Sequence, residues 1–266
     1  MVHKITEQNL LRDRHVLGKG WNGTYGGYFS DLTIANRFVD AAVPHFFKKG
    51  NKNIDIVYAC AGNGFLGEVF CQRLQELGAN PSLTLIEASK EHLAQNANSK
   101  THKINADLLE VKLARQFDVA IMRSSLDYFP TNQLQREALR CIARHLKPGG
   151  VLFNQCAALG TARERNLVDK CYGATISKIG KRHFQCDADI SKIYYATGFG
   201  EVQKIGSAKN LVLTHEDYAK RYKIGAKDIA TIRKIIRSAA FKHPNVRLTQ
   251  KGYMITFHYP IYAARK

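Results

Sequence analysis

The segment Ile54–Gly67, IDIVYACAGNGFLG, is the sequence feature that most constrains the fold of this chain. An apolar, β-branched run leads into Gly62-Asn63-Gly64 and then Gly67, and the residues after it, 68–77, have helical spacing. This order predicts a strand, a glycine turn and a helix. In such a unit, backbone N–H groups and a helix N-terminus can approach a ligand closely.

Two carboxylates extend this prediction. Glu87 ends a second apolar run, LTLIE, 23 residues after Gly64, where it could accept hydrogen bonds from ribose hydroxyls. Asp107, in INADLLEV, stands where an adenine amino group could donate to it. We therefore expect a nucleoside-containing cofactor. The glycine spacing also matches the dinucleotide fingerprint, so an NAD-dependent oxidoreductase remains an alternative.

Strand-like and helical segments alternate along the chain. This alternation predicts parallel βαβ units and a doubly wound α/β sheet. Near the end, the sequence from Tyr253 onward alternates apolar and polar residues as a late strand would. The expected strands cover residues 54–60, 83–87, 102–106, 117–122, 150–156 and 199–205, and the expected helices cover residues 34–47, 67–77, 89–97, 132–146 and 226–240.

The domain organisation is expected to be simple. Residues 1–50 read as an N-terminal cap and lid segment, and residues 51–266 read as the cofactor-binding domain, with a basic lid or insert near 157–245. The stretch WNGTYGGYFSD is rich in glycine and aromatic residues, so Trp21, Tyr25 and Tyr28 are expected to line the substrate end of the pocket.

Charge is unevenly distributed over the chain. The formal net charge is +18, of which residues 1–150 contribute +5 and residues 151–266 contribute +13. A field of this sign attracts acidic partners: nucleic acid, an acidic protein or an anionic small substrate. No apolar run reaches the ~18 residues that a membrane-spanning helix needs. The start of the chain lacks the apolar core of a signal peptide, and the six cysteines form no CxxC pair, so we expect a cytoplasmic protein with reduced thiols.

The ordered set of motifs resembles the class I S-adenosylmethionine-dependent methyltransferases over roughly residues 50–156. The set comprises the glycine turn, Glu87, Asp107, Phe117-Asp118 at the start of a strand, and LKPGG before the next one. The resemblance implies a Rossmann-like, seven-stranded, mostly parallel sheet with an antiparallel C-terminal strand. It also implies S-adenosyl-L-methionine as cofactor, S-adenosyl-L-homocysteine as product, and no metal. The implied cofactor contacts are Tyr58, Ala59, Cys60, Gly62, Gly64, Glu87, Ala88, Asp107, Leu108, Met122 and Arg123.

The sequence departs from the family pattern at two of these positions. The family usually has an acidic residue at the end of the first strand and a glycine two positions later, where this chain has Tyr58 and Cys60. Loss of the acid weakens the expected grip on the cofactor's ammonium group. A non-catalytic module that binds S-adenosylmethionine is therefore a further alternative.

Four residues are candidates for a direct role in methyl transfer. Asp127, Tyr128 and Arg123 follow the expected strand at 117–122, and His183 lies in the basic run KIGKRHF. A hydroxyl or amine acceptor benefits from a base, whereas a carboxylate acceptor needs a cationic or hydrogen-bonding clamp instead. Each residue also has a possible structural role. The roles are a helix cap for Asp127, a packed ring for Tyr128, an ion pair for Arg123 and a solvated surface position for His183.

The acceptor is expected to be acidic. The turn RSSLDYFP lacks the Asn/Asp-Pro-Pro-aromatic sequence of enzymes that methylate exocyclic base amines, which argues against a nucleic-acid acceptor. Because the chain is strongly basic, an RNA methyltransferase remains an alternative. The C-terminal stretch from DYAKRYKIG to YMITFHYPIYAARK has a faint similarity to the malonyl-carrier-protein O-methyltransferases. Because acyl carrier proteins are acidic, we expect methylation, at oxygen, of an acidic small-molecule or carrier-bound substrate.

Overall fold

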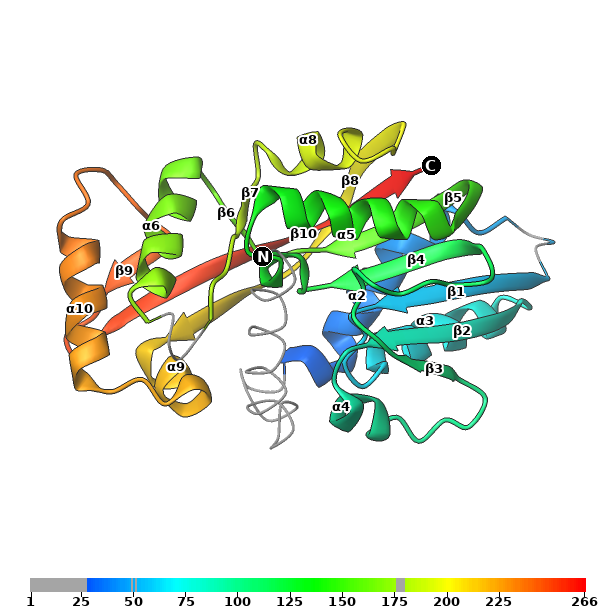
Figure 1. Cartoon of the computed structure of the whole chain (residues 1–266), viewed down its shortest axis with the longest axis horizontal. Helices are drawn as coiled ribbons and strands as arrows, with labels where there is room; N and C mark the ends of the chain where they lie inside the picture. The colour runs from blue at the N-terminus through cyan, green and yellow to red at the C-terminus, as the bar shows by residue number, and fades with distance from the viewer. Residues whose placement is uncertain (1–27, 49, 51, 176–179) are drawn as a thin grey trace.

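The computed structural model of the chain describes residues 28–48, 50, 52–175 and 180–266, and a mixed sheet organises them (Figure 1). Five adjacent parallel strands follow the order β3-β2-β1-β4-β5, and β10 (Tyr253–Arg265) joins the β5 edge antiparallel to it. The parallel strands are β1 (Asn53–Ala59), β2 (Asn80–Glu87), β3 (His102–Asn105), β4 (Phe117–Arg123) and β5 (Leu146–Gln155). The doubly wound α/β fold with an antiparallel C-terminal strand is therefore confirmed.

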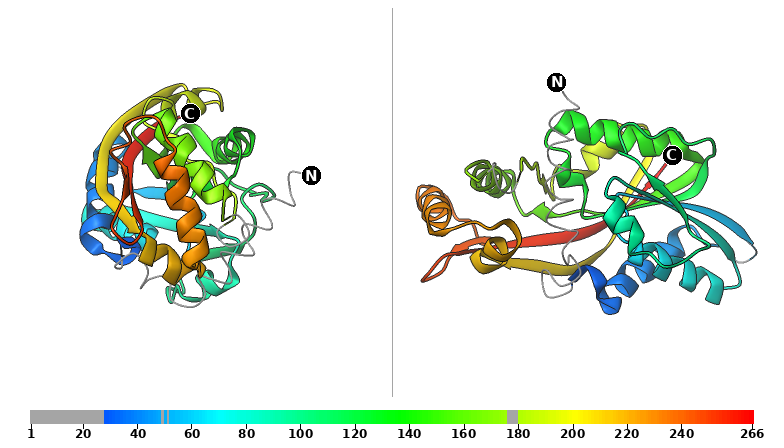
Figure 2. Two further views of the ribbon diagram at one scale, coloured as in Figure 1. Left: turned by 90° about the vertical axis from the view of Figure 1, so that its left-hand side faces the viewer. Right: turned by 60° about the horizontal axis from the view of Figure 1, so that its bottom comes forward.

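Helices cover both faces of the parallel strands (Figures 1 and 2). On one face, α2 (Leu32–Ala42) and α3 (Phe65–Glu76) share a core with β1, and on the other α5 (Asn132–His145) packs with α8 (Ile190–Tyr195). The short α4 (Lys90–Ala94) lies against β2 and β3. Side chains of Asp31, Ser89 and Thr131 cap the first turns of α2, α4 and α5 by accepting backbone N–H groups.

Two long antiparallel strands carry the fold beyond its parallel part. β8 (Glu201–Thr214) pairs with β10 over most of its length, and both run out past the end of β5 (Figure 1). Around their far ends lie elements that the sequence analysis did not resolve individually, except for the helix expected at 226–240: β6 (Ala158–Leu159), α6 (Ala162–Gly173), β7 (Gln185–Cys186), α9 (His215–Tyr222), α10 (Ala226–Arg237) and β9 (Val246–Leu248). We call the described residues of 157–187 and 208–259 the extension.

The extension has an apolar core of its own. Tyr218, Tyr253 and Phe257 are almost fully buried there and belong to a cluster separate from the two cores that flank the parallel strands. The alternation predicted from Tyr253 onward supplies this burial, because every second side chain of β10 faces the same side. The sheet therefore connects the parallel α/β part of the molecule to the separate apolar core of the extension.

The N-terminal cap falls only partly within the described residues, and Trp21 and Tyr25 lie outside them. The described part is packed onto the main fold: Phe38 and Val39 of α2 are fully buried in the core that contains Ile56 of β1. After α2 the chain forms the short 3-10 helix η2 (Val43–His45). No helix in the described ranges combines the length and the apolar character required to cross a bilayer.

Candidate functional site

The turn after β1 has the conformation that a close ligand approach requires. Cys60, Gly62 and Gly64 have φ angles of +52°, +58° and +80°. Glycine adopts such angles freely, whereas a residue with a Cβ is strained there by about 1–2 kcal/mol. Cys60 stands where the family that the sequence resembles usually has a glycine. Its backbone nevertheless keeps the left-handed conformation that glycine adopts freely.

The turn is fixed from behind by the packing of α3 on β2. A Cβ added at Gly64 would lie 2.5 Å from Leu85 Cδ1 and 2.8 Å from Asn96 Nδ2, so only glycine fits. The Asn96 amide in turn donates to the Asn63 carbonyl and to Glu68 Oε1, both at 3.1 Å. These contacts hold the turn in place at the N-terminus of α3.

The two predicted carboxylates lie at the carboxyl ends of neighbouring strands. Glu87, at the end of β2, accepts the Gly62 N–H at 2.9 Å through Oε2 and the Ser89 N–H at 2.9 Å through Oε1. Asp107, just beyond β3, accepts the Leu109 N–H at 2.9 Å. Ala88 and Leu108 beside them are buried. The structure thus brings the glycine turn, Glu87 and Asp107 to one edge of the sheet.

Tyr58 and Arg123 occupy the neighbouring strand ends. Tyr58 pairs with Ile121 in the β1–β4 register, so Arg123, two residues further along β4, faces the same side of the sheet. Burial raises the pKa of the Tyr58 hydroxyl, and the positive charge of the adjacent Arg123 guanidinium opposes that shift. Met122 points to the opposite face, into the core below α5.

Arg123 is buried, with 7% of its surface exposed. Its Nη2 donates to the Phe29 carbonyl at 2.7 Å, and its Cζ lies 5.5 Å from the centre of the Phe29 ring. Among the described residues, no hydrogen-bond partner is found for Nη1. A buried guanidinium N–H without a partner is costly, so an acceptor oxygen at this point would stabilise Arg123.

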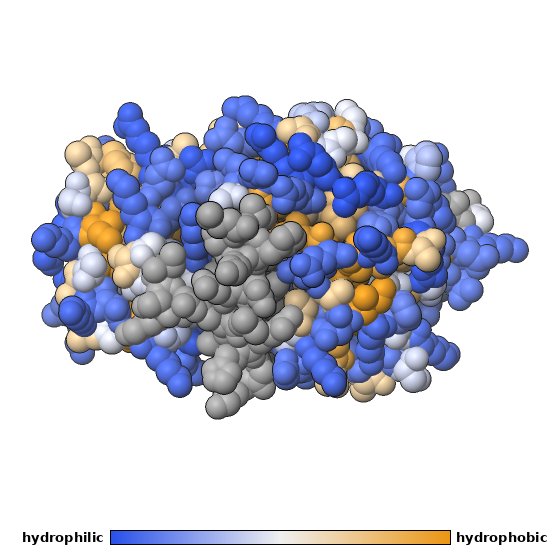
Figure 3. Space-filling view, viewed as in Figure 1, coloured by the Kyte–Doolittle hydropathy of each residue, from blue (hydrophilic) through white to orange (hydrophobic). Residues whose placement is uncertain are grey.

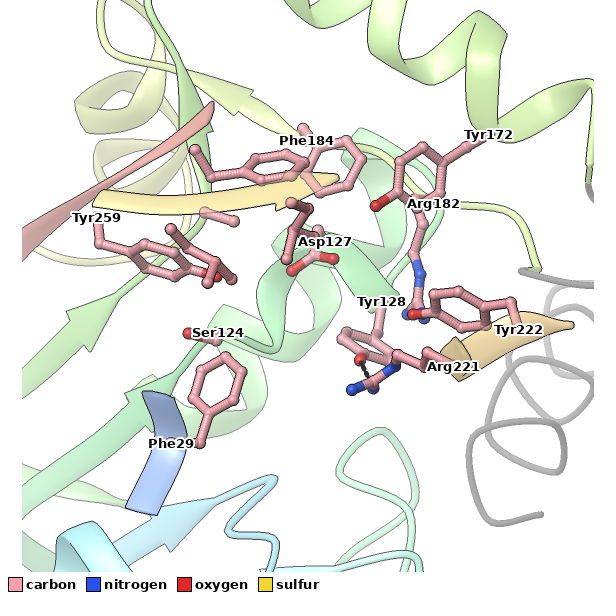
Figure 4. A pocket seen from close by; sticks show the side chains of 14 residues that line it. Phe29, Ser124, Asp127, Tyr128, Tyr172, Arg182, Phe184, Arg221, Tyr222 and Tyr259 are labelled. Carbon is pink, nitrogen blue, oxygen red and sulfur yellow. Dashed lines mark hydrogen bonds between the residues drawn. The ribbon is translucent and has the colours of Figure 1, made fainter. Parts of the chain in front are cut away.

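A cavity of about 50 Å³ opens between the end of β4 and the extension (Figure 4). Asp127 and Tyr128, in the 3-10 turn η3 (Leu126–Tyr128) after β4, line it, as do Phe29 and Ser124. The remaining wall comes from the extension and is mainly aromatic and cationic: Ala157, Tyr172, Arg182, Phe184, Leu211, Leu213, Arg221, Tyr222, Phe257 and Tyr259. We call this cavity the aromatic pocket.

Two arginines converge on Tyr128 in the aromatic pocket (Figure 4). Arg221 Nη2 donates to the Tyr128 hydroxyl at 3.2 Å, and the Arg182 guanidinium carbon lies 3.3 Å from the centre of the Tyr128 ring. Both arginines are about 95% buried, and Asp127 is the carboxylate that shares the pocket with them. Two cations against one carboxylate leave the pocket suited to an anion.

The other sequence candidates lie close to the aromatic pocket without lining it. His183 places its ring between Asp169, at 3.2 Å from Nδ1, and Asn132, at 3.0 Å from Nε2. Its backbone N–H donates to the Asp127 carbonyl at 3.1 Å. Tyr28 packs against Phe29 and Tyr259, and its hydroxyl donates to the Lys209 carbonyl. In these positions His183 and Tyr28 can support the wall of the pocket. A catalytic role for His183 stays a prediction.

Sequence reasoning missed the two pocket arginines and the tyrosines Tyr172, Tyr222 and Tyr259. Arg182 stands in KIGKRHF, which was noted as a basic run, and Arg221 stands in DYAKRYKIG, which was noted only for its similarity to the malonyl-carrier-protein O-methyltransferases. Nothing local separates these arginines from the exposed Lys181 and Lys223 near them. Among the described residues, no group of three His, Cys, Asp or Glu side chains is arranged to hold a metal ion.

Comparison with known proteins agrees with this geometry. Residues 37–152 match the family model described as "Methyltransferase domain". The malonyl-[acyl-carrier protein] O-methyltransferase of Priestia megaterium is 24% identical over 175 residues, which are 63% of this chain and 60% of that enzyme. The chain thus matches about three fifths of the length of this curated relative.

Solved structures share the fold. The YcgJ protein of Bacillus subtilis superposes with a TM-score of 0.68 at 13% identity, covering 87% of this chain and 98% of that one. A methyltransferase from Bacillus halodurans, described as putative, gives a TM-score of 0.67 at 15% identity, covering 89% and 99%. Residues 37–152 of this chain thus match a methyltransferase domain, and the chain shares the fold of these solved structures.

Proposed function

We propose that the chain transfers the methyl group of S-adenosylmethionine to a carboxylate of an acidic small-molecule or carrier-bound substrate. The cofactor would lie across the carboxyl ends of β3, β2, β1 and β4, and the acceptor would enter the aromatic pocket. The observation that carries the proposal is the convergence of Arg182 and Arg221 on Tyr128 beside those strand ends.

The residues at the strand ends suit the proposed cofactor. Glu87 retains oxygen lone pairs beyond its two backbone contacts, so it can accept ribose hydroxyls. Asp107 can accept the adenine amino group, with the buried Leu108 beside the ring. The positive φ angles of Gly62 and Gly64 let the backbone approach the nucleoside. The buried N–H of Arg123 without a partner fits a ligand with an acceptor oxygen.

The aromatic pocket supports a carboxylate acceptor over a neutral amine or hydroxyl. Arginine guanidinium groups bind and orient carboxylates through paired N–H donors. S-adenosylmethionine supplies an electrophilic methyl group on a positively charged sulfur. A carboxylate oxygen would form the new C–O bond as the C–S bond breaks, and the electron pair of that bond remains on sulfur. No proton is released, so no general base is required, and Asp127 would exclude water and help to orient the arginines.

A carrier-bound substrate is supported by the charge of the extension. The exposed side chains of Lys227, Lys234 and Arg237 lie on α10, and residues 151–266 carry a formal charge of +13. On the face seen in Figure 3, hydrophilic residues over this part are interspersed with apolar ones. An acidic carrier would be drawn to the basic residues of this surface. This expectation also agrees with the carrier-protein relative described above.

The proposal can be tested with radiolabelled S-adenosylmethionine and a panel of carboxylic acids, free and as carrier-protein thioesters. We expect transfer to a carboxylate, detected as a product whose label is released as volatile methanol by mild alkali. An alkali-stable product would indicate methylation at nitrogen or at a hydroxyl instead and would contradict the proposal. For a carrier-bound acceptor, kcat/KM should fall several-fold between low and physiological salt, because screening weakens the encounter.

A matched pair of variants connects activity to the aromatic pocket. Arg182→Met should lower kcat/KM for the acidic acceptor about tenfold or more, with the dissociation constant for S-adenosylhomocysteine unchanged. Arg237→Met removes the same charge from the exposed face of α10 and should leave the free-acid reaction unaltered. Equal losses in the two variants would contradict a specific role for the pocket.

A further inference from the structure

Polar groups at the ends of β4 and β5 form a small buried set that the fold itself does not satisfy. Arg123 and Gln155 are paired in the β4–β5 register, and Gln155 has no exposed surface. Within the described residues, Arg123 Nη1 and both polar side-chain atoms of Gln155 have no hydrogen-bond partner. Buried groups of this kind are normally satisfied, so their occurrence side by side indicates a ligand group that completes them.

The charge of this set favours an anion. Arg123 contributes a full positive charge, and its other hydrogen bond goes to the neutral Phe29 carbonyl. The nearest strand end, on β1, carries Tyr58 with its pKa raised by burial, and therefore an uncharged hydroxyl. Because a buried cation is stable only when paired, the complementary group here is a carboxylate or a similar oxyanion.

The place of Arg123 in the sheet indicates which carboxylate this is. Glu87 ends β2, the glycine turn follows β1, and Arg123 ends β4, so the three lie in the spatial order of adjacent strands. From the end of β2 to the end of β4 is two strand spacings, roughly 9–10 Å. A cofactor with its ribose at Glu87 would have its amino-acid end at the far side of the turn, where Arg123 could contact it.

We propose that Arg123, assisted by Gln155 and the Tyr58 hydroxyl, binds the α-carboxylate of the methionine portion of S-adenosylmethionine. The inference rests on the function proposed above and adds that a positively charged side chain, in place of the family's acid, binds the amino-acid end of the cofactor. Where the family has an acid that favours the cofactor's ammonium group, this chain has an uncharged tyrosine beside a buried arginine that favours its carboxylate. The combination explains why Tyr58 is tolerated: an aspartate there would face Arg123 and neutralise it.

The test compares two ligands that differ only in this carboxylate. Isothermal calorimetry on the full chain would measure S-adenosylmethionine and decarboxylated S-adenosylmethionine. We expect the decarboxylated ligand to bind at least tenfold more weakly to the wild-type chain. Arg123→Met should remove most of that difference by weakening only the ligand that has the carboxylate. Arg136→Met, at an exposed position of α5, is the matched control and should preserve the difference.

The outcomes separate this inference from the proposed function. If both ligands bind the wild-type chain equally well, the carboxylate grip is wrong and the cofactor assignment stands. If neither ligand nor S-adenosylhomocysteine binds, the proposed function itself fails. The wild-type comparison needs no variant, so it remains decisive even if Arg123→Met does not fold.

Tyr58→Asp gives an independent check. The usual arrangement of the family would make this change tighten S-adenosylmethionine binding by restoring an acid for the ammonium group. Binding of the cofactor's carboxylate by Arg123 predicts the reverse: the new carboxylate at position 58 pairs with Arg123 and weakens S-adenosylmethionine binding several-fold. Thermal melting without ligand confirms that the variant is folded, and tighter binding by a folded Tyr58→Asp variant would overturn the inference.

Discussion

The two halves of the candidate site are built in different ways. The cofactor half uses short segments that directly follow parallel strands: the glycine turn after β1, Glu87 and Asp107. The aromatic pocket combines the end of β4 with Arg182, Arg221 and rings of the extension, which are 49 to 136 residues beyond Arg123 at the end of β4. The first half depends on local backbone geometry, and the second depends on long-range packing around β8 and β10.

This difference predicts that backbone changes damage the cofactor half most. Gly64→Ala places a Cβ 2.5 Å from Leu85 Cδ1 at a φ of +80°. The variant should unfold more easily by about 2–5 kcal/mol, the sum of backbone strain and overpacking, and should lose measurable S-adenosylhomocysteine binding. Urea unfolding and calorimetry measure the two effects.

Gly78→Ala is the matched control for the steric part of this effect. Gly78 has a similar φ of +84°, but an added Cβ would meet nothing within 4 Å. It should lose about 1–2 kcal/mol from strain alone and bind S-adenosylhomocysteine normally. Equal destabilisation of the two variants would mean that Leu85 moves aside and that the turn is not fixed by the packing of α3 on β2.

A reciprocal pair of side-chain variants sharpens the comparison between the halves. Glu87→Gln should weaken S-adenosylhomocysteine binding about tenfold, because a charge-assisted acceptor of ribose hydroxyls becomes a neutral amide, roughly 1.4 kcal/mol. The acceptor KM should then change little. Arg221→Met should show the opposite pattern, with an intact cofactor dissociation constant and a raised acceptor KM. Calorimetry and steady-state kinetics on both variants provide the measurements.

The pair also has an outcome that would refute the division. Arg221 donates to the Tyr128 hydroxyl and supports the turn after β4, so a loss of cofactor affinity in Arg221→Met would show that the two halves form one cooperative unit. In that case the acceptor pocket helps to order the cofactor site, and substrate binding would be coupled to cofactor binding.

The same division explains what the sequence could predict. Alternating strand and helix periods identified the parallel sheet, and the ends of its strands located Gly62, Gly64, Glu87 and Asp107, because parallel strands bring their carboxyl ends to one edge. The late alternation from Tyr253 correctly indicated a strand, β10. These elements have local signals that tertiary contacts do not override.

The aromatic pocket had no such signal. Arg182 and Arg221 are buried only because β6, β7 and α9 are gathered around the far ends of β8 and β10. A basic run in the sequence is normally a solvated surface, and its periodicity does not report which of its members turns inward. Arg123 was noted as an anion clamp or an ion-pair partner; its unsatisfied N–H beside Gln155 became visible only in three dimensions.

Thiol reactivity offers the smallest expected effect and a direct view of how the two regions open. Burial raises the pKa of all six cysteines, to about 12 for Cys71 on α3 and for Cys171 in the extension. A raised pKa means less thiolate at a given pH, so at pH 8 only about one Cys71 or Cys171 thiol in 10,000 is ionised, and alkylation requires opening. We expect slow iodoacetamide labelling of the folded chain, followed by mass spectrometry, and fast labelling in urea.

If the extension opens separately, Cys171 should react before Cys71, because local unfolding exposes the less stable region first. Equal rates for the two thiols would show that the parallel sheet and the extension unfold together, and that β10 joins them into one cooperative structure.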